Sequence, residues 1–282
     1  MAFTKNRFQL VGNWDEIRAK LQEVQASDSK AETEISRANK AAGWGCGLLV
    51  AGIVCLFVVP PLSGILMFAG GAVIVLGMIY RAMNSSYDLE NQRYEVPLKL
   101  LETICVDLEP NKEISLTVDF RASQNSQFVQ KVEQSKFLIF STGPKVTYFS
   151  HPWLSLSAIT ALGYKLQVDI TREGTYKEVP KRKRTKTKLR FYDTVSVAVR
   201  PPRGSSLSAE ATGTPLAAPL NHRFRSFRGQ VTSRGAVAKV AGPVSWVVSN
   251  RGTSSGGEQL GARDILTLIM SAFRGVVQTS KA

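Results

Sequence analysis

The chain has 282 residues, of which 44% are hydrophobic and 21% are charged, enough for one large core or two small ones and too apolar for disorder throughout. Lys and Arg number 36 against 22 for Asp and Glu, a formal charge of +14, so a macromolecular partner is expected to be anionic. The three cysteines lack zinc or redox spacing and there are only two histidines, so no metal or cofactor is expected.

Residues 1–40 are expected to form an N-terminal amphipathic helix. Apolar side chains recur at alternating spacings of three and four, a heptad pattern that only Asp28 interrupts. The pattern indicates either a coiled coil that binds a partner or a single helix lying on the protein's own domain or on the bilayer surface. Its short length favours the single helix. The seam consists of Trp14, Ile17, Leu21, Val24, Asp28, Ala31, Ile35 and Ala38.

Residues 41–80 contain no charged side chain. A membrane-spanning helix needs about 20 apolar residues, and this stretch provides two such lengths on either side of Pro60 and Pro61. We therefore predict a transmembrane hairpin of two helices, residues 41–59 and 62–80. A buried helical pair in a soluble protein is disfavoured because neither segment has a polar face.

The apolar segments carry two further signals. Basic residues flank the predicted spans and the loop between them has none, which places both termini in the cytoplasm. Within the first span, Gly43, Gly47 and Ala51 form a stripe of small residues that favours close helix packing. The stripe is expected to pack the first span against the second or, alternatively, to join copies of the chain in a homo-oligomer.

Beyond the second span, residues 81–200 are expected to form a short helix and a β-rich cytoplasmic domain. Pro97 is well suited to be the first residue of the helix, and Pro110 ends it. Apolar residues then alternate with polar ones, which predicts strands. The expected strands are residues 114–120, 137–140, 146–149, 153–159 and 164–171.

The rest of the chain divides into a linker and a C-terminal segment. Residues 201–221 are rich in Pro, Gly and Ser, which predicts a linker or a long loop. Residues 222–282 are expected to add strands and a helix from Asp264, packed on the β domain. The predicted fold class is therefore α+β, with a transmembrane hairpin between an N-terminal amphipathic helix and an antiparallel β-rich cytoplasmic domain.

The strongest surface feature is a basic run at residues 181–190, which contains no acid. Read at a period of two, its last four bases fall on one face, and Thr185, Thr187, Leu189 and Phe191 fall on the other, which predicts a strand. The bases of the run are Lys181, Arg182, Lys183, Arg184, Lys186, Lys188 and Arg190.

Three interpretations of the basic run compete. The bases protect an edge strand against pairing with other sheets, or they bind anionic lipid or an acidic protein, or they follow a nucleic-acid backbone. Asp169 and Glu173 on the preceding strand are expected to neutralise part of the run through cross-strand pairs. Nucleic acid ranks last, because Tyr192 is the only aromatic residue expected on the basic face.

No catalytic residue can be assigned from the sequence. Residues 252–256 match the GxSxG pattern of a nucleophile elbow, but no histidine follows, and a flexible turn accounts for them better. His151 is expected in a turn near a buried Trp153. We expect an integral membrane protein that serves as a non-enzymatic binding or scaffold protein, with its basic domain on anionic lipid or an acidic protein. The alternative is a membrane-associated enzyme or assembly factor without a recognisable motif.

Overall fold

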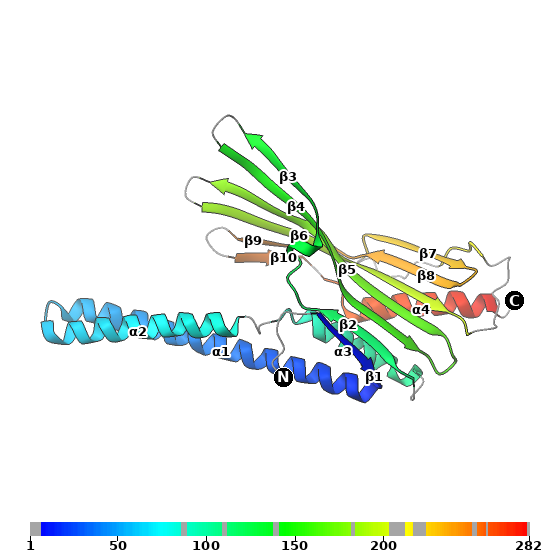
Figure 1. The fold of residues 1–282 in the computed structure, drawn as a ribbon, viewed down its shortest axis with the longest axis horizontal. Helices are drawn as coiled ribbons and strands as arrows, with labels where there is room; N and C mark the ends of the chain where they lie inside the picture. The colour runs from blue at the N-terminus through cyan, green and yellow to red at the C-terminus, as the bar shows by residue number, and fades with distance from the viewer. Residues whose placement is uncertain are drawn as a thin grey trace. The chain divides into compact units, whose positions relative to one another are not determined.

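The computed structural model describes residues 7–85, 89–108, 112–137, 141–181, 184–202, 212–216, 224–249, 253–257 and 259–280. The chain divides into two compact units. Among the described residues, a helical unit comprises residues 20–91, and a sheet unit joins residues 7–19 with those from Gln92 onward. The whole is a mixture of helix and antiparallel sheet with two long apolar helices (Figure 1).

Two long helices, α1 (Trp14–Cys55) and α2 (Pro60–Asn84), form most of the helical unit. The expected amphipathic helix and first apolar segment are one continuous helix, since no Pro or other breaker separates them. The boundaries at the turn also differ from the prediction. Helix α1 ends four residues early, and α2 begins at Pro60, because proline is well tolerated in the first turn of a helix.

The heptad seam of α1 is buried within the chain. Leu21, Val24, Ala31 and Ala38 are each no more than 5% exposed. Asp28, expected as an interruption, is fully buried and its Oδ1 accepts the backbone N–H of Leu89 at 2.6 Å. Its carboxylate therefore satisfies a buried donor, and the seam fits the interpretation as a single helix packed on its own chain.

Small residues spaced seven apart bring the backbones of α1 and α2 together. A Cβ added at Gly45 would lie 2.9 Å from the carbonyl oxygen of Gly70, and one added at Gly52 would lie 3.2 Å from that of Ser63. By contrast, Gly43 and Gly47 have no neighbour within 4 Å, and Ala51 is exposed. The contact expected of that stripe is thus made by other glycines, and its role in self-association stays a prediction.

Both helices are long and apolar enough to cross a membrane. Only 17% of the most apolar window of each is buried. Phe57 and Phe68 are 88% and 82% exposed. These helices therefore present apolar side chains outward, unlike the core helices of a soluble protein.

One antiparallel sheet of ten strands forms the framework of the sheet unit among the described residues. The strands are β1 (Arg7–Gly12), β2 (Ile114–Asp119), β3 (Val129–Phe137), β4 (Ser141–Ile159), β5 (Lys165–Lys181), β6 (Arg184–Arg200), β7 (Ser226–Thr232), β8 (Gly235–Ala241), β9 (Ser245–Ser249) and β10 (Thr253–Gly256). The helices are α3 (Gln92–Ile104) and α4 (Ala262–Ser280), with single 3₁₀ turns at Cys105–Asp107 and Ser126–Phe128.

Strands β4, β5 and β6 are long enough to take part in two tiers of the sheet. In the lower tier the order is β1-β2-β4-β5-β6-β8-β7. In the upper tier, β3 replaces β2 beside β4, while β9 and β10 replace β8 and β7 beside β6. We call this upper tier the wing. Figure 1 shows it extending beyond α3 and α4, which lie against strands of the lower tier.

The two faces of the sheet differ in composition. On the inner face of the lower tier, alternate residues of β5 and β6 are fully buried, among them Val168 and Val197. Helix α4 covers this face through apolar residues such as Leu268 and Ala272. The intervening residues form the outer face, which is polar and partly exposed.

The differences of the sheet unit from the sequence prediction include the start of α3 and an additional strand, β1. Helix α3 begins at Gln92, five residues before the predicted start, and Pro97 lies inside it. Strand β1 was not expected and pairs with β2 from Arg7 opposite Asp119 to Gly12 opposite Ile114. Most of the predicted linker at 201–221 lies outside the described residues.

A matched pair of glycine substitutions tests the packing of α1 on α2. We expect Gly45→Ala to lower the free energy of unfolding by about 1–3 kcal/mol, because its methyl would meet backbone atoms. Gly43→Ala should cause no loss, since its Cβ enters open space. Thermal unfolding of the full-length protein in detergent measures both, and equal effects would contradict this packing.

Candidate functional site

The basic run lies on β6, with the alternation that the sequence predicts. Lys188 is directly opposite Lys177 on β5, and Arg190 is opposite Thr175. Both belong to the outer face, whereas Phe191 is buried on the inner face. Lys186 shares the outer face, and Lys181 pairs with Arg184 at the end of the β5–β6 hairpin. Arg182 and Lys183 lie outside the described residues.

Strand β6 is not an edge strand where it carries the basic run. Residues Thr187–Phe191 pair with β9 on the side away from β5. In this segment β6 is therefore hydrogen-bonded to a strand on each side, and its bases have no free edge to protect. The interpretation of the run as an edge guard is wrong for this part of β6.

Among the residues whose side chains the structure describes, like charges lie directly opposite each other at three places on the outer face. Besides Lys177 with Lys188 in the wing, Lys165 faces Arg200 and Arg228 faces Lys239 in the lower tier. Like charges in directly opposed positions destabilise a sheet. This face therefore holds bases that repel each other within each pair.

The acids nearest to the basic run form hydrogen bonds with neutral groups, and no ion pair with a base is seen for them among the described residues. Asp169 is opposite Ser196, and its carboxylate accepts hydrogen bonds from Ser155 at 2.6 Å and Gln167 at 2.9 Å. Glu173 is opposite Tyr192 and accepts its hydroxyl at 2.8 Å, which raises the pKa of Tyr192. The cross-strand ion pairs expected of both acids are replaced by these bonds to neutral groups.

Two aromatic residues that sequence reasoning missed share the outer face with Arg190. Tyr148 is opposite Thr175 on one side, and Trp246 is opposite Arg190 on the other. They form one row across four strands, and Trp246 is 37% exposed. Finding this row requires the order of the strands, because Tyr148 and Trp246 are far apart in sequence.

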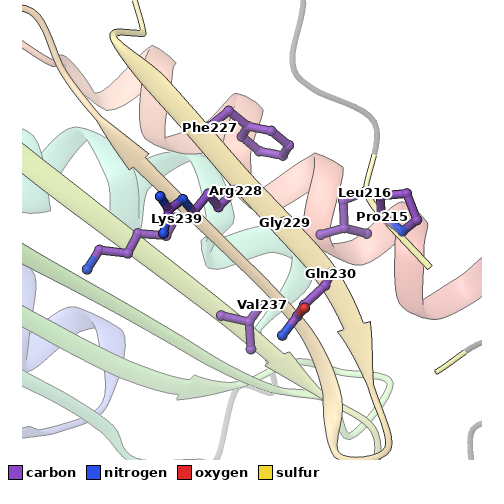
Figure 2. A pocket seen from close by; sticks show the side chains of 8 residues that line it. All are labelled: Pro215, Leu216, Phe227, Arg228, Gly229, Gln230, Val237 and Lys239. Atoms are coloured by element: carbon purple, nitrogen blue, oxygen red, sulfur yellow. The ribbon is translucent and has the colours of Figure 1, made fainter. Parts of the chain in front are cut away.

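A half-open cavity of about 510 Å³ lies beside strands β7 and β8. Pro215, Leu216 and Phe227 contribute apolar surface, while Arg228 and Lys239 contribute charge. Figure 2 shows these two bases projecting over the neighbouring strands and away from Pro215 and Leu216. The charged part of the lining is thus continuous with the outer face.

On the inner face, a row of titratable residues crosses the three long strands where the lower tier meets the wing. His151, Arg172 and Asp193 are successive cross-strand partners and all are at most 4% exposed. The Nε and Nη2 atoms of Arg172 donate to Asp193 at 2.9 and 3.0 Å, and Nη2 also donates to Gln92 at 2.8 Å. Trp153 Nε1 donates to Asp193 at 3.3 Å.

His151 lies on β4, rather than in the turn expected from the sequence, and it has a serine and an acid beside it. Its Nδ1 is 3.1 Å from Ser123 Oγ, and its Nε2 is 3.6 Å from Asp119 Oδ2. We call His151, Arg172 and Asp193, together with Ser123, Asp119 and Arg93, the buried cluster. Arg93 donates to the carbonyl oxygen of Asp119 at 2.7 Å and to Ser123 Oγ at 3.3 Å.

The buried cluster has the residue types of a catalytic triad but not the geometry. The distance between His151 and Asp119 is too long for a hydrogen bond, and Asp119 is held by Arg121 Nε at 2.9 Å. His151 is fully buried and Ser123 is 8% exposed. The cavity beside β7 and β8 includes no member of the cluster. The hydrogen bonds of the cluster instead connect β5 to β6 and join α3 to both β2 and β5.

Burial and charge set the protonation states in the cluster. Burial, reinforced by Arg93, lowers the pKa of His151 to about 4. Burial raises the pKa of Asp119, but the hydrogen bonds from Arg121 outweigh it and hold the pKa below its ordinary value of 3.8. His151 is therefore neutral and Asp119 ionised near neutral pH.

The described part of the GxSxG match at residues 252–256 does not form a nucleophile elbow. Residues 253–256 of the GxSxG match form β10, and residue 252 is outside the described chain. Helix α4 does not follow until Ala262, so the strand, sharp turn and helix of a nucleophile elbow are not present in the described residues. Comparisons with protein-family models, characterised proteins and solved structures gave no match.

The pKa of His151 predicts a loss of stability in mild acid. The unfolded chain takes up a proton near pH 6.5, whereas the folded chain does so only near pH 4. We therefore expect the free energy of unfolding to fall by up to about 3 kcal/mol as the pH drops from 6.5 to 4. Asp119 has its pKa below 3.8, so its contribution is lost only in stronger acid.

Thermal unfolding of the full-length protein, followed by circular dichroism from pH 7 to pH 4, measures this dependence. His151→Gln should start from a lower midpoint and show a shallower decline, since Gln does not titrate. A wild-type midpoint that stays constant over this window would contradict the assignment of His151 as a buried neutral residue.

Proposed function

We propose that this chain is a membrane-anchored, non-enzymatic binding protein whose outer sheet face binds the anionic headgroups of the adjacent membrane surface. The observation that carries the proposal is the set of three directly opposed pairs of bases on one face of the sheet. An anionic surface placed against that face relieves the repulsion within each pair. The binding free energy is therefore more favourable than it would be for the same number of bases placed far apart.

The anchor is formed by the apolar part of α1 and by α2. Their lengths and composition suit two membrane crossings, in which the exposed apolar side chains contact the lipid acyl chains. The turn between the two helices contains neither Lys nor Arg. In this arrangement the turn crosses to the far side and the basic flanks remain in the cytoplasm.

Strand pairing supports an even number of crossings. Strand β1 precedes both apolar helices, and β2 follows them, yet the two strands are hydrogen-bonded neighbours from Arg7 to Gly12. A bilayer cannot separate two strands of one sheet. Both flanks of the apolar helices therefore lie on one side, which agrees with the charge distribution.

Lipid accounts for the outer face better than a specific protein partner does. The bases are spread over β5, β6, β7 and β8 rather than gathered at one point, which suits a diffuse field of charge. Each Lys or Arg near an anionic leaflet contributes about 1 kcal/mol. Tyr148 and Trp246, beside Arg190, add aromatic rings of the kind that favours the headgroup region.

Vesicle binding tests this function. Full-length protein in nanodiscs of phosphatidylcholine should bind vesicles that contain phosphatidylserine and ignore vesicles of phosphatidylcholine alone, and salt should weaken the binding. Changing Lys177, Lys188, Arg228 and Lys239 to Gln should reduce the affinity by about fivefold for each charge that contacts the lipid. Lys145→Gln, on the inner face beside Glu178, is the matched control and should have little effect.

Two results would overturn the lipid assignment. Equal, negligible binding of the wild type to both kinds of vesicle would remove lipid as the partner. Salt-sensitive binding to a single-stranded oligonucleotide, with no preference between the vesicles, would assign the face to nucleic acid, for which Tyr148 and Trp246 would act as stacking residues.

Cysteine labelling tests the topology. In a variant with Cys46, Cys55 and Cys105 changed to Ser, we expect Gln9→Cys and Gln124→Cys to resist an impermeant maleimide in intact cells and to react after permeabilisation. Phe57→Cys, in the turn between α1 and α2, should react from outside. Reaction of Gln9→Cys and Gln124→Cys from opposite sides would rule out two crossings.

A further inference from the structure

The edge of the wing carries a segment that is complementary to itself. Strand β3 pairs with β4 on one side, and no second neighbour of β3 is found among the described residues. Its residues 130–134 read Gln-Lys-Val-Glu-Gln, and all five are exposed. When this segment is reversed, Gln falls opposite Gln, Lys opposite Glu and Val opposite Val.

From this self-complementarity we infer that two copies of the chain associate by antiparallel pairing of β3 with β3, centred on Val132. In this register Lys131 of each copy lies opposite Glu133 of its partner, and Val132 lies opposite the partner's Val132. Opposite charges and β-branched residues in directly opposed positions both stabilise antiparallel pairs. The free backbone groups along β3 supply the hydrogen bonds of a β-augmented interface.

The parity of the strand favours this register over its neighbours. Lys131 and Glu133 share the outer face with Tyr148 and Val146, whereas Val132 is on the inner face with Thr147. Pairing residues of equal parity keeps the outer faces of both copies on the same side of one continuous sheet. A slip by two residues would place Glu133 opposite its own counterpart and bring like charges together.

Irregularities in β3 limit the paired segment to its centre. The register with β4 shifts between Val129 and Lys131 and again between Gln134 and Lys136. Bulges bend a strand and end regular pairing. The regular part, residues 131–134, contains the charged residues and the valine of the self-complementary segment, and Val132, 49% exposed, is the apolar centre of that segment. The ion pair of Lys131 with Glu133 in one chain, at 2.6 Å, is exposed and can exchange for the pair between copies.

Disulfide formation between copies tests the register. In the full-length protein reconstituted in lipid at low density, with its three cysteines changed to Ser, Val132→Cys should form a crosslinked dimer on mild oxidation, because directly opposed Cα atoms lie about 4.5–5.5 Å apart. Gln130→Cys alone should not crosslink, since its own counterpart is about four residues away along the strand. A mixture of Gln130→Cys and Gln134→Cys should yield the mixed dimer.

Charge reversal supplies a second, independent measurement. Lys131→Glu in the Val132→Cys background should slow crosslinking by about tenfold, because both Lys–Glu pairs become repulsive. Adding Glu133→Lys restores the complementarity and should restore the rate. Equal crosslinking of Val132→Cys and Gln130→Cys would show random collision, and no crosslinking at Val132 would show a bare edge; either result overturns the inference.

Discussion

The buried ion pair between Arg172 and Asp193 is the contact on which the arrangement of the sheet unit depends. Both side chains are almost fully buried, and the pair joins β5 to β6 at the level where the lower tier meets the wing. The same guanidinium reaches Gln92 on α3, while the adjacent Arg93 donates to carbonyl oxygens at the end of β2. Removing either partner would leave a buried charge without compensation, which costs several kcal/mol. The pair therefore fixes the register of β5 on β6, and the bond from Arg172 to Gln92 holds α3 against these strands.

That fixed register explains how the outer face can hold opposed bases. If the register of a sheet could shift, one strand would move along its neighbour and separate the like charges. Here, such a slip would also displace Arg172 from Asp193 and move the buried residues of β5 and β6 away from α4. The buried contacts of the inner face therefore keep Lys177 and Lys188 opposite each other despite their repulsion. Stability on the inner face permits a charged outer face that a partner can neutralise.

The sequence allowed prediction of the features that depend on local pattern. The two apolar helices follow from charge-free length, and the alternation in the basic run placed Lys188 and Phe191 on opposite faces. Strand order is set by pairings between distant segments, so neither the row of Tyr148 with Trp246 nor the interior position of β6 could be read from the sequence. The buried cluster was missed for the same reason, since its charged members look like surface residues until the strands are aligned. In β1 only Phe8 and Leu10 alternate with polar residues before Val11 and Gly12 break the pattern, which made the strand too weak to recognise.

The pairing of β1 with β2 also imposes an order on folding. Strand β1 is synthesised first, but its partner follows both apolar helices, about a hundred residues later. At roughly 5–20 residues per second of translation, β1 waits for about 5–20 s before it can pair. Pairing over so long a separation is slow, because the intervening chain must be ordered first. Strand β1 is therefore expected to join the sheet only after the apolar helices have formed.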